Sequence, residues 1–173
     1  MTVEMGKYSY GNIEIFGRGK ITVGKFCSMA LDVKAVFLND HRIDWVSTYQ
    51  FAKKWGLPEV DDDDSITSNR LIIIENDVWI GRGVTLLAGT KICNGSAVGA
   101  FSVVASEISP YTVVVGNPAK PIRKRFSDEQ IQKLLEIKWW DWPRAKIQKN
   151  VPMLCSSNID LFISKSSKKL DLK

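Results

Sequence analysis

His41 is the only histidine in the chain, and histidine is the side chain whose ordinary pKa suits proton transfer near neutral pH. It lies in the polar run Asn39-Asp40-His41-Arg42, at the point where a regular six-residue pattern stops. A lone histidine is more often structural than catalytic. Polar and aromatic residues follow this one closely, however, and could form a pocket for an acceptor molecule. His41 is therefore a candidate for proton transfer, with a structural role as the alternative.

A second candidate site is the segment Gly116-Asn117-Pro118-Ala119-Lys120-Pro121 with the basic residues that follow it. Its prolines favour an extended backbone, because the proline ring fixes φ. Arg123, Lys124 and Arg125 come directly afterwards, and their cations could bind phosphate groups. A phosphate-bearing cofactor explains this cluster more economically than nucleic acid does.

Charge and composition exclude several other classes of function. The net charge of +5 is modest, and no known nucleic-acid-binding module accompanies it. The three cysteines are too few and too widely spaced for a disulfide framework or a zinc site, so we expect no metal. No apolar run approaches the roughly 20 residues that span a bilayer, and no apolar leader begins the chain. We expect a cytoplasmic protein that binds neither nucleic acid nor membrane.

An aliphatic residue recurs at every sixth position in the middle of the chain. A second register, two residues earlier, holds small or β-branched residues and ends at Ile108. Neither the helical nor the strand period explains a spacing of six. The aliphatic register comprises Ile74, Ile80, Leu86, Ile92, Val98 and Val104.

A parallel β-helix explains the repeat physically. Each hexapeptide supplies one short strand and one corner of a triangular coil, so three of them complete a turn. The aliphatic residue points inward and stacks on its equivalent in the next coil, and the coils satisfy one another's backbone hydrogen bonds. Ile15, Ile21, Cys27 and Val33 continue a six-residue ladder towards the N-terminus. Ordinary strands in a sandwich are the alternative.

Two regions lack the period. Residues 40–70 contain Trp45, Tyr49 and Trp55 together with the acidic run Asp61–Asp64, and we expect a projecting loop with a solvated tip. After Pro121 the apolar spacing becomes helical, and Ser127 before two acidic residues is typical of a helix N-cap.

These patterns divide the chain into three parts. We expect a β-helix domain over residues 1–126 with a loop insertion at about 40–70, helices over 127–150 that cap the open end of the coil, and a partly ordered tail over 151–173. We expect Trp139, Trp140 and Trp142 to pack in these capping helices, with contacts to an acceptor molecule as the alternative.

Several motifs together resemble a known family, the hexapeptide acyltransferases, and within it the xenobiotic acetyltransferases named for chloramphenicol and streptogramin acetyltransferases. The resemblance covers about residues 6–150. It depends on Asn76-Asp77-Val78-Trp79-Ile80-Gly81, Val98-Gly99-Ala100, the Gly116–Pro121 segment, His41-Arg42-Ile43-Asp44-Trp45 with Thr48-Tyr49, and Leu135-Glu136-Ile137-Lys138-Trp139-Trp140-Asp141-Trp142-Pro143.

The resemblance implies a left-handed parallel β-helix that forms a homotrimer with active sites between subunits. It also implies acetyl-CoA as the acetyl donor and His41 as the general base that deprotonates a hydroxyl group of the acceptor. Asp44 and Tyr49 are candidates for acceptor contacts. The positions that match the cofactor-binding segments of the family are Trp79, Ala100, Asn117, Pro118, Lys120 and Arg123.

The same residues permit other interpretations. Trp79 could pack in the trimer rather than against the cofactor, and Ala100 could be only a corner residue. The loop departs from the subfamily around Glu59-Val60, which leaves the acceptor open: an antibiotic or a sugar of a surface polysaccharide. Alternatives to O-acetylation are N-acetylation of a nucleotide-linked amino sugar and a non-catalytic trimeric scaffold. A single histidine excludes the three-histidine zinc site of the γ-type carbonic anhydrases.

Overall fold

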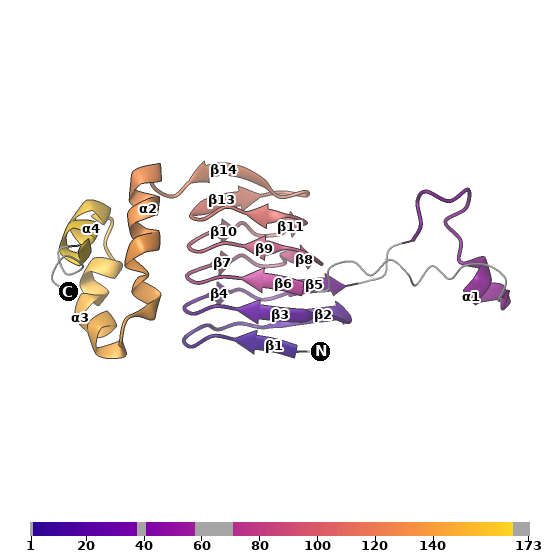
Figure 1. The fold of residues 1–173 in the computed structure, drawn as a ribbon, viewed down its shortest axis with the longest axis horizontal. Coiled ribbons are helices and arrows are strands. Elements are labelled where there is room, and N and C mark those ends of the chain that lie inside the picture. The colour runs from indigo at the N-terminus through magenta and orange to yellow at the C-terminus, as the bar shows by residue number, and fades with distance from the viewer. Residues whose placement is uncertain (1, 38–40, 58–70, 168–173) are drawn as a thin grey trace.

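The computed structural model describes residues 2–37, 41–57 and 71–167, and its main body is a stack of short strands that wind as a parallel β-helix. The strands form three sheets, one on each side of the coil (Figure 1). The first sheet contains β1 (Thr2–Met5), β3 (Lys20–Val23), β6 (Leu71–Ile74), β9 (Lys91–Ile92) and β12 (Glu107–Ile108). The second contains β4 (Ser28–Met29), β7 (Trp79–Ile80), β10 (Ala97–Val98), β13 (Thr112–Val115) and β14 (Lys120–Lys124). The third contains β2 (Ile13–Gly17), β5 (Val33–Phe37), β8 (Thr85–Leu87) and β11 (Val103–Val104).

The predicted repeat of three hexapeptides per coil is confirmed in the central coils. Trp79 pairs with Ala97, and Thr85 pairs with Val103, so equivalent residues are 18 positions apart. Every member of the predicted aliphatic register from Ile74 to Val104 is at most 1% exposed. These side chains stack inside the coil and form its core.

The last coil differs from the prediction. Ile108 pairs with Ile92, which lies 16 residues earlier, and Val114 pairs with Val98 at the same shortened spacing. The sequence placed Ile108 on the second register, whereas the structure places it on the ladder of Ile92. A corner after β11 that is two residues shorter causes the shift, and counting by six does not detect such a deletion.

Up to residue 167, the last one described, three helices and one short 3-10 helix follow the coil. They are α2 (Asp128–Ile137), η2 (Trp139–Asp141), α3 (Arg144–Leu154) and α4 (Ile159–Ser167). Ser127 begins α2 with a capping box, in which its hydroxyl accepts a hydrogen bond from Gln130 and the Gln130 side chain accepts one from the Ser127 amide. Phe162 of α4 is 3% exposed, so part of the predicted tail packs on the helices.

The helices lie along the side of the coil and not over its open end, contrary to the expectation of a cap (Figure 1). The reason is that β14 turns back and pairs antiparallel with β13, so this strand covers the last coil. The ring of Tyr111, in a late coil, packs 5.7 Å from that of Phe126 before α2. Phe26, in an early coil, packs 4.9 Å from Trp139 after α2, so the helix spans the stack.

One corner of the coil, between the first and second sheets, faces these helices. Its residues are linked from coil to coil by backbone hydrogen bonds such as Asp77 N to Lys25 O and Tyr111 N to Asn94 O. One residue of each turn has positive φ. This column, called here the helix-side corner, consists of Tyr8, Phe26, Asp77, Gly95 and Tyr111.

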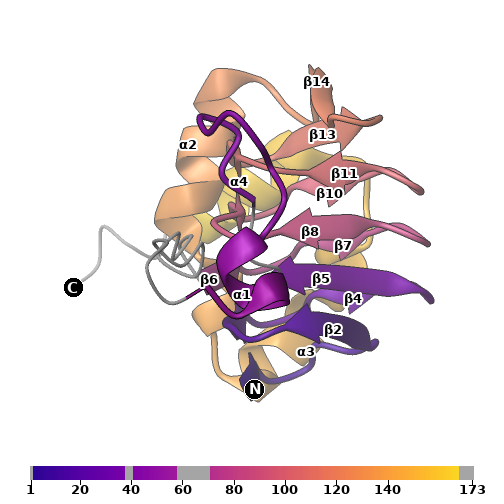
Figure 2. The ribbon, with the colours of Figure 1, turned by 90° about the vertical axis from the view of Figure 1, so that its right-hand side faces the viewer.

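Residues 41–57, which include α1 (Phe51–Trp55), project from the coil on the side away from the helices (Figures 1 and 2). This segment lies between β5 and β6 in the chain. Ile43 is 89% exposed and Val46 fully exposed, although both are apolar. The acidic run Asp61–Asp64 lies outside the described residues. None of the helices in the described ranges combines the length and the apolar character needed to cross a membrane.

Candidate active site

The ring of His41 is oriented by its own loop. Its Nδ1 lies 2.6 Å from the carbonyl oxygen of Thr48, and the side chain is exposed. A carbonyl oxygen only accepts hydrogen bonds, so Nδ1 carries the proton and donates it. In the neutral ring this leaves the lone pair on Nε2. The loop therefore fixes the tautomer in which Nε2 is a base.

Asp44 is paired with Arg42 on the same turn of chain. Arg42 Nε donates to Asp44 Oδ1 at 2.7 Å, and its second nitrogen donates to Oδ2, a bidentate arrangement. These hydrogen bonds lower the pKa of the exposed Asp44 carboxyl to about 2, so it is ionised at neutral pH. The guanidinium also lies over the Trp45 ring, 5.3 Å from its centroid. Asp44 thus presents a fixed negative charge three residues from His41.

Tyr49 belongs to a row of aromatic rings on the projecting segment. Its ring centroid is 4.8 Å from that of Phe51, which is 4.9 Å from that of Trp55. All three rings are at least 36% exposed, so the row presents an apolar surface next to His41. Such a surface suits an aromatic or aliphatic binding partner.

Trp79 stands on the outer face of the second sheet, where it is 55% exposed while its neighbours Val78 and Ile80 point inward. It lines a cavity of about 320 Å³ with Ala97, Arg123 and Arg125. Apolar surface and the cation of Arg123 therefore adjoin in this groove, whereas Arg125 is paired with Asp77, which also lines it. Its composition suits a molecule with both an uncharged chain and phosphate groups.

Ala100 is exposed at the next corner of the coil. A Cβ atom on Gly81, in the preceding coil, would lie 2.6 Å from the Ala100 backbone nitrogen. The glycine therefore permits the two corners to stack closely, and the small side chain of Ala100 adds little bulk to the outer surface of the corner.

Asn117 and Pro118 lie in the reversal between β13 and β14, joined by a cis peptide bond. Lys120 and Arg123 follow on the exposed β14. They line a cavity of about 520 Å³ with Lys124 and Ser106. Of the predicted cofactor residues, Trp79, Lys120 and Arg123 line these two cavities, which share Arg123. Ala100, Asn117 and Pro118 line neither cavity.

The structure brings the predicted site residues together in two groups. His41, Asp44 and Tyr49 share the projecting segment, whereas the other group shares the second sheet and its corner. Within one chain the segment projects away from the coil, so the groups do not meet (Figure 1). Sequence reasoning missed the Thr48 carbonyl as the partner of His41. No residue type reports such a contact, because every residue has a carbonyl and only the loop conformation selects one.

Comparison with known proteins gives consistent relatives. Residues 72–106 match the bacterial transferase hexapeptide (six repeats) family. A chloramphenicol acetyltransferase of Klebsiella aerogenes is 41% identical over 143 residues, which are 81% of this chain and 68% of that protein. A probable macrolide acetyltransferase of Lysinibacillus sphaericus is 38% identical over 92% of this chain and 93% of its own. Among solved structures, the N-acyltransferase AntD of Bacillus cereus, 17% identical, has a TM-score of 0.51 over 90% of this chain and 69% of that one, which shows a shared fold.

Proposed function

The chain belongs to the hexapeptide-repeat acetyltransferases, in the group that contains the chloramphenicol and macrolide acetyltransferases, and from this we propose that acetyl-CoA is its donor and His41 its general base. It is an acetyltransferase, and its reaction is transfer of an acetyl group to a hydroxyl of the acceptor. The scaffold alternative is set aside by these relatives.

The bond between His41 and Thr48 carries this proposal. With the proton held on Nδ1, Nε2 accepts the proton of the acceptor hydroxyl as the hydroxyl oxygen attacks the acetyl carbonyl. The imidazolium then returns this proton to the leaving sulfur, so His41 ends in its starting state. A positioned base of this kind contributes about 100-fold to 10,000-fold in rate.

The donor site is assigned to the second sheet. The groove beside Trp79 and Ala97 offers apolar surface for an uncharged arm, and Lys120, Arg123 and Lys124 offer cations for phosphates. These residues fit the donor by their chemistry. When bound, acetyl-CoA supplies an activated thioester carbonyl.

We further propose that the protein is a homotrimer of left-handed coils whose sites lie between subunits. Two observations support this arrangement: the apolar side chains that the projecting segment exposes, and the distance between that segment and the groove within one chain. A neighbouring subunit that packs on the segment would bury those side chains, and His41 would then lie at the groove of that neighbour.

An antibiotic with a free hydroxyl group is the acceptor class that we favour, because the relatives are named for chloramphenicol and macrolides. The aromatic row beside His41 offers such a molecule an apolar surface. A sugar hydroxyl is the second candidate, since a less similar relative, 35% identical over 60% of this chain, is named as a putative lipopolysaccharide O-acetyl transferase.

The test is an assay of CoA thiol release from acetyl-CoA with chloramphenicol, a macrolide or an amino-sugar nucleotide as acceptor. We expect turnover with a hydroxyl acceptor and a fall of at least about 100-fold in His41→Ala. Lys54→Ala, an exposed change on the same segment, is the matched control and should retain turnover. Near wild-type turnover in His41→Ala would contradict the general-base role, and turnover with the amino sugar alone would indicate N-acetylation.

A further inference from the structure

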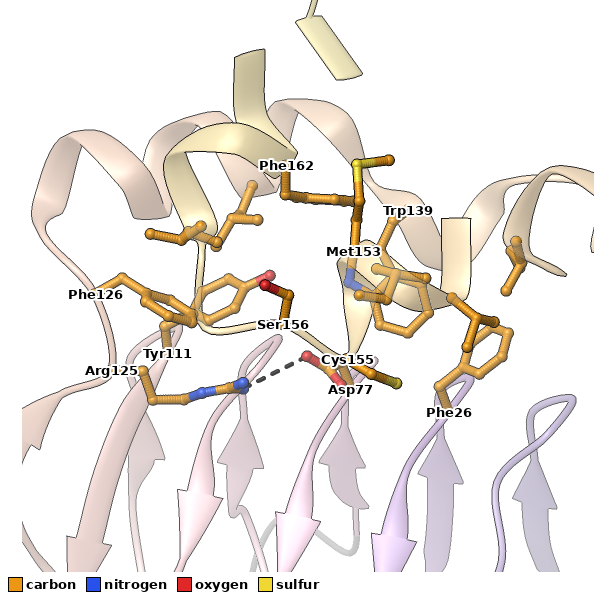
Figure 3. A pocket seen from close by; sticks show the side chains of 15 residues that line it. Phe26, Asp77, Tyr111, Arg125, Phe126, Trp139, Met153, Cys155, Ser156 and Phe162 are labelled. Atoms are coloured by element: carbon orange, nitrogen blue, oxygen red, sulfur yellow. Dashed lines mark hydrogen bonds and ion pairs between the residues drawn. The ribbon is translucent and has the colours of Figure 1, made fainter. Parts of the chain in front are cut away.

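A cavity of about 400 Å³ lies between the helix-side corner and the C-terminal helices (Figure 3). Phe26, Asp77 and Arg125 border both this cavity and the groove beside Trp79, and the other residues that line the cavity are not among those assigned above to acetyl transfer. Its walls are mainly aromatic and aliphatic, with Phe26 and Trp139 on one side, Phe126 on the other and Phe162 above, among the helices. Its volume falls in the range of about 300–1,000 Å³ that is usual for small-molecule sites.

One buried polar group faces this apolar space. Tyr111 is 1% exposed, and its hydroxyl has no hydrogen-bond partner within the described residues. Burial raises the pKa of the phenol, so the hydroxyl stays protonated and remains a donor. Leaving such a group unsatisfied costs about 1–3 kcal/mol. In Figure 3 the hydroxyl points towards the helices, into the space that Ser156 also borders.

The Tyr111 ring is held in place from two sides. A Cβ atom on Gly95 would lie 2.3 Å from the ring, so the Tyr111 ring packs directly against the Gly95 backbone. The Arg125 guanidinium lies against both Tyr111 and Phe126, 5.4 Å and 5.2 Å from their ring centroids. The hydroxyl is therefore a fixed donor rather than a mobile one.

The charges that border the cavity are already paired. Arg125 lies 3.5 Å from Asp77 Oδ2 and donates a hydrogen bond to the Gly95 carbonyl at 2.5 Å. Burial raises the pKa of Asp77, and the charge of Arg125 opposes that rise. Because this pair is neutral overall, a ligand here needs no charge of its own.

We propose that this cavity binds a neutral, flat, mainly aromatic small molecule with one hydrogen-bond acceptor, which accepts a hydrogen bond from the Tyr111 hydroxyl. The aromatic walls supply stacking and edge contacts, and the single donor fixes the orientation. This site does not depend on the proposed function, since none of its chemistry uses acetyl transfer.

The experiment uses 6-propionyl-2-dimethylaminonaphthalene, a neutral fluorescent naphthalene with one ketone, as the probe. We expect saturable binding of one probe per chain to the full-length protein, with an emission shift that reports a hydrogen bond to the ketone. Tyr111→Phe keeps the ring and removes the donor, and should weaken binding about threefold to tenfold. Tyr10→Phe removes an exposed hydroxyl away from the cavity and should bind like wild type.

Two further measurements locate the probe. Cys155 is exposed and borders the cavity, so bound probe should slow its reaction with N-ethylmaleimide, followed by mass spectrometry. Saturating CoA should not displace the probe. Absence of saturable binding, as for a cavity that holds only water, would overturn the proposal. Equal affinity in Tyr111→Phe or displacement by CoA would overturn it as well.

Discussion

In the coil the aliphatic side chains of Ile80 and Leu86 are fully buried, whereas in the projecting segment Ile43 and Val46 are almost fully exposed. Both regions are rich in apolar residues. The coil buries its own because each turn stacks on the next, with paired strands and inward ladders. Among the residues that the structure describes, the segment has no such neighbour.

Stability and chemistry therefore depend on different regions of the molecule. The coil is complete in one chain and provides a rigid groove, while the candidate base His41 lies on the region whose apolar surface is still uncovered. An active site that combines the groove of the coil with His41 of the segment therefore requires the segment to pack on another chain. The following changes test how far the two regions differ.

The largest expected effect comes from removing the same side chain in each region. Leu86→Ala leaves a cavity in the coil core and should lower the free energy of unfolding by about 2–5 kcal/mol. Leu57→Ala, at a residue that is 41% exposed after α1, should change it by less than about 0.5 kcal/mol. Urea denaturation followed by circular dichroism measures both, and equal losses would contradict the contrast.

Two glycines with similar backbone angles permit a finer comparison. Gly95 in the coil has φ +71°, and a Cβ there would lie 2.3 Å from the Tyr111 ring, whereas Gly56 after α1 has φ +66° and no atom within 4 Å. Gly95→Ala should therefore cost at least about 2 kcal/mol, from backbone strain and the steric clash together. Gly56→Ala should cost about 1 kcal/mol or less, from backbone strain alone. Similar melting temperatures for the two variants would show that the Tyr111 ring moves aside freely.

The smallest effect concerns reactivity and leaves stability unchanged. Burial, and then a hydrogen bond to Glu107, raises the pKa of Cys93 to about 11. At pH 8 only about one molecule in a thousand then carries the Cys93 thiolate, and this fraction reaches one half only at about pH 11. Iodoacetamide at pH 8 should alkylate the exposed Cys155 and spare Cys93, as peptide mass mapping will show. Comparable rates at pH 8 would mean that the coil opens around Cys93.

The sequence predicted the coil well because its period is local. Each inward residue from Ile74 to Val104 satisfies the same constraint, so the pattern is visible without any tertiary information. The prediction failed at Ile108, because the corner before it is shorter and nothing in the residue types marks a deletion. The predicted position of the helices, over the open end of the coil, was also wrong. β14 pairs antiparallel with β13 and covers the last coil, and residue periodicity does not reveal such pairing.

The candidate site was predictable only in part. A single histidine at the break in the repeat indicated His41, and the resemblance to known motifs supplied Trp79 and Arg123. The carbonyl of Thr48 and the pairing of Asp44 with Arg42 depend on loop conformation. The cavity at Tyr111 depends on residues far apart in the sequence that meet only after the helices fold against the coil.

Subunit complementation tests the central claim most directly. His41→Ala removes the base from the projecting segment, and Ala97→Trp fills the groove beside Trp79, which Ala97 lines, so each variant alone should lose nearly all turnover. If the base and the groove come from different subunits, chains refolded together in equal amounts should regain about a quarter of wild-type activity, because random assortment pairs an intact segment with an intact groove at that frequency. Activity no greater than the sum of the two separate variants would contradict a shared site.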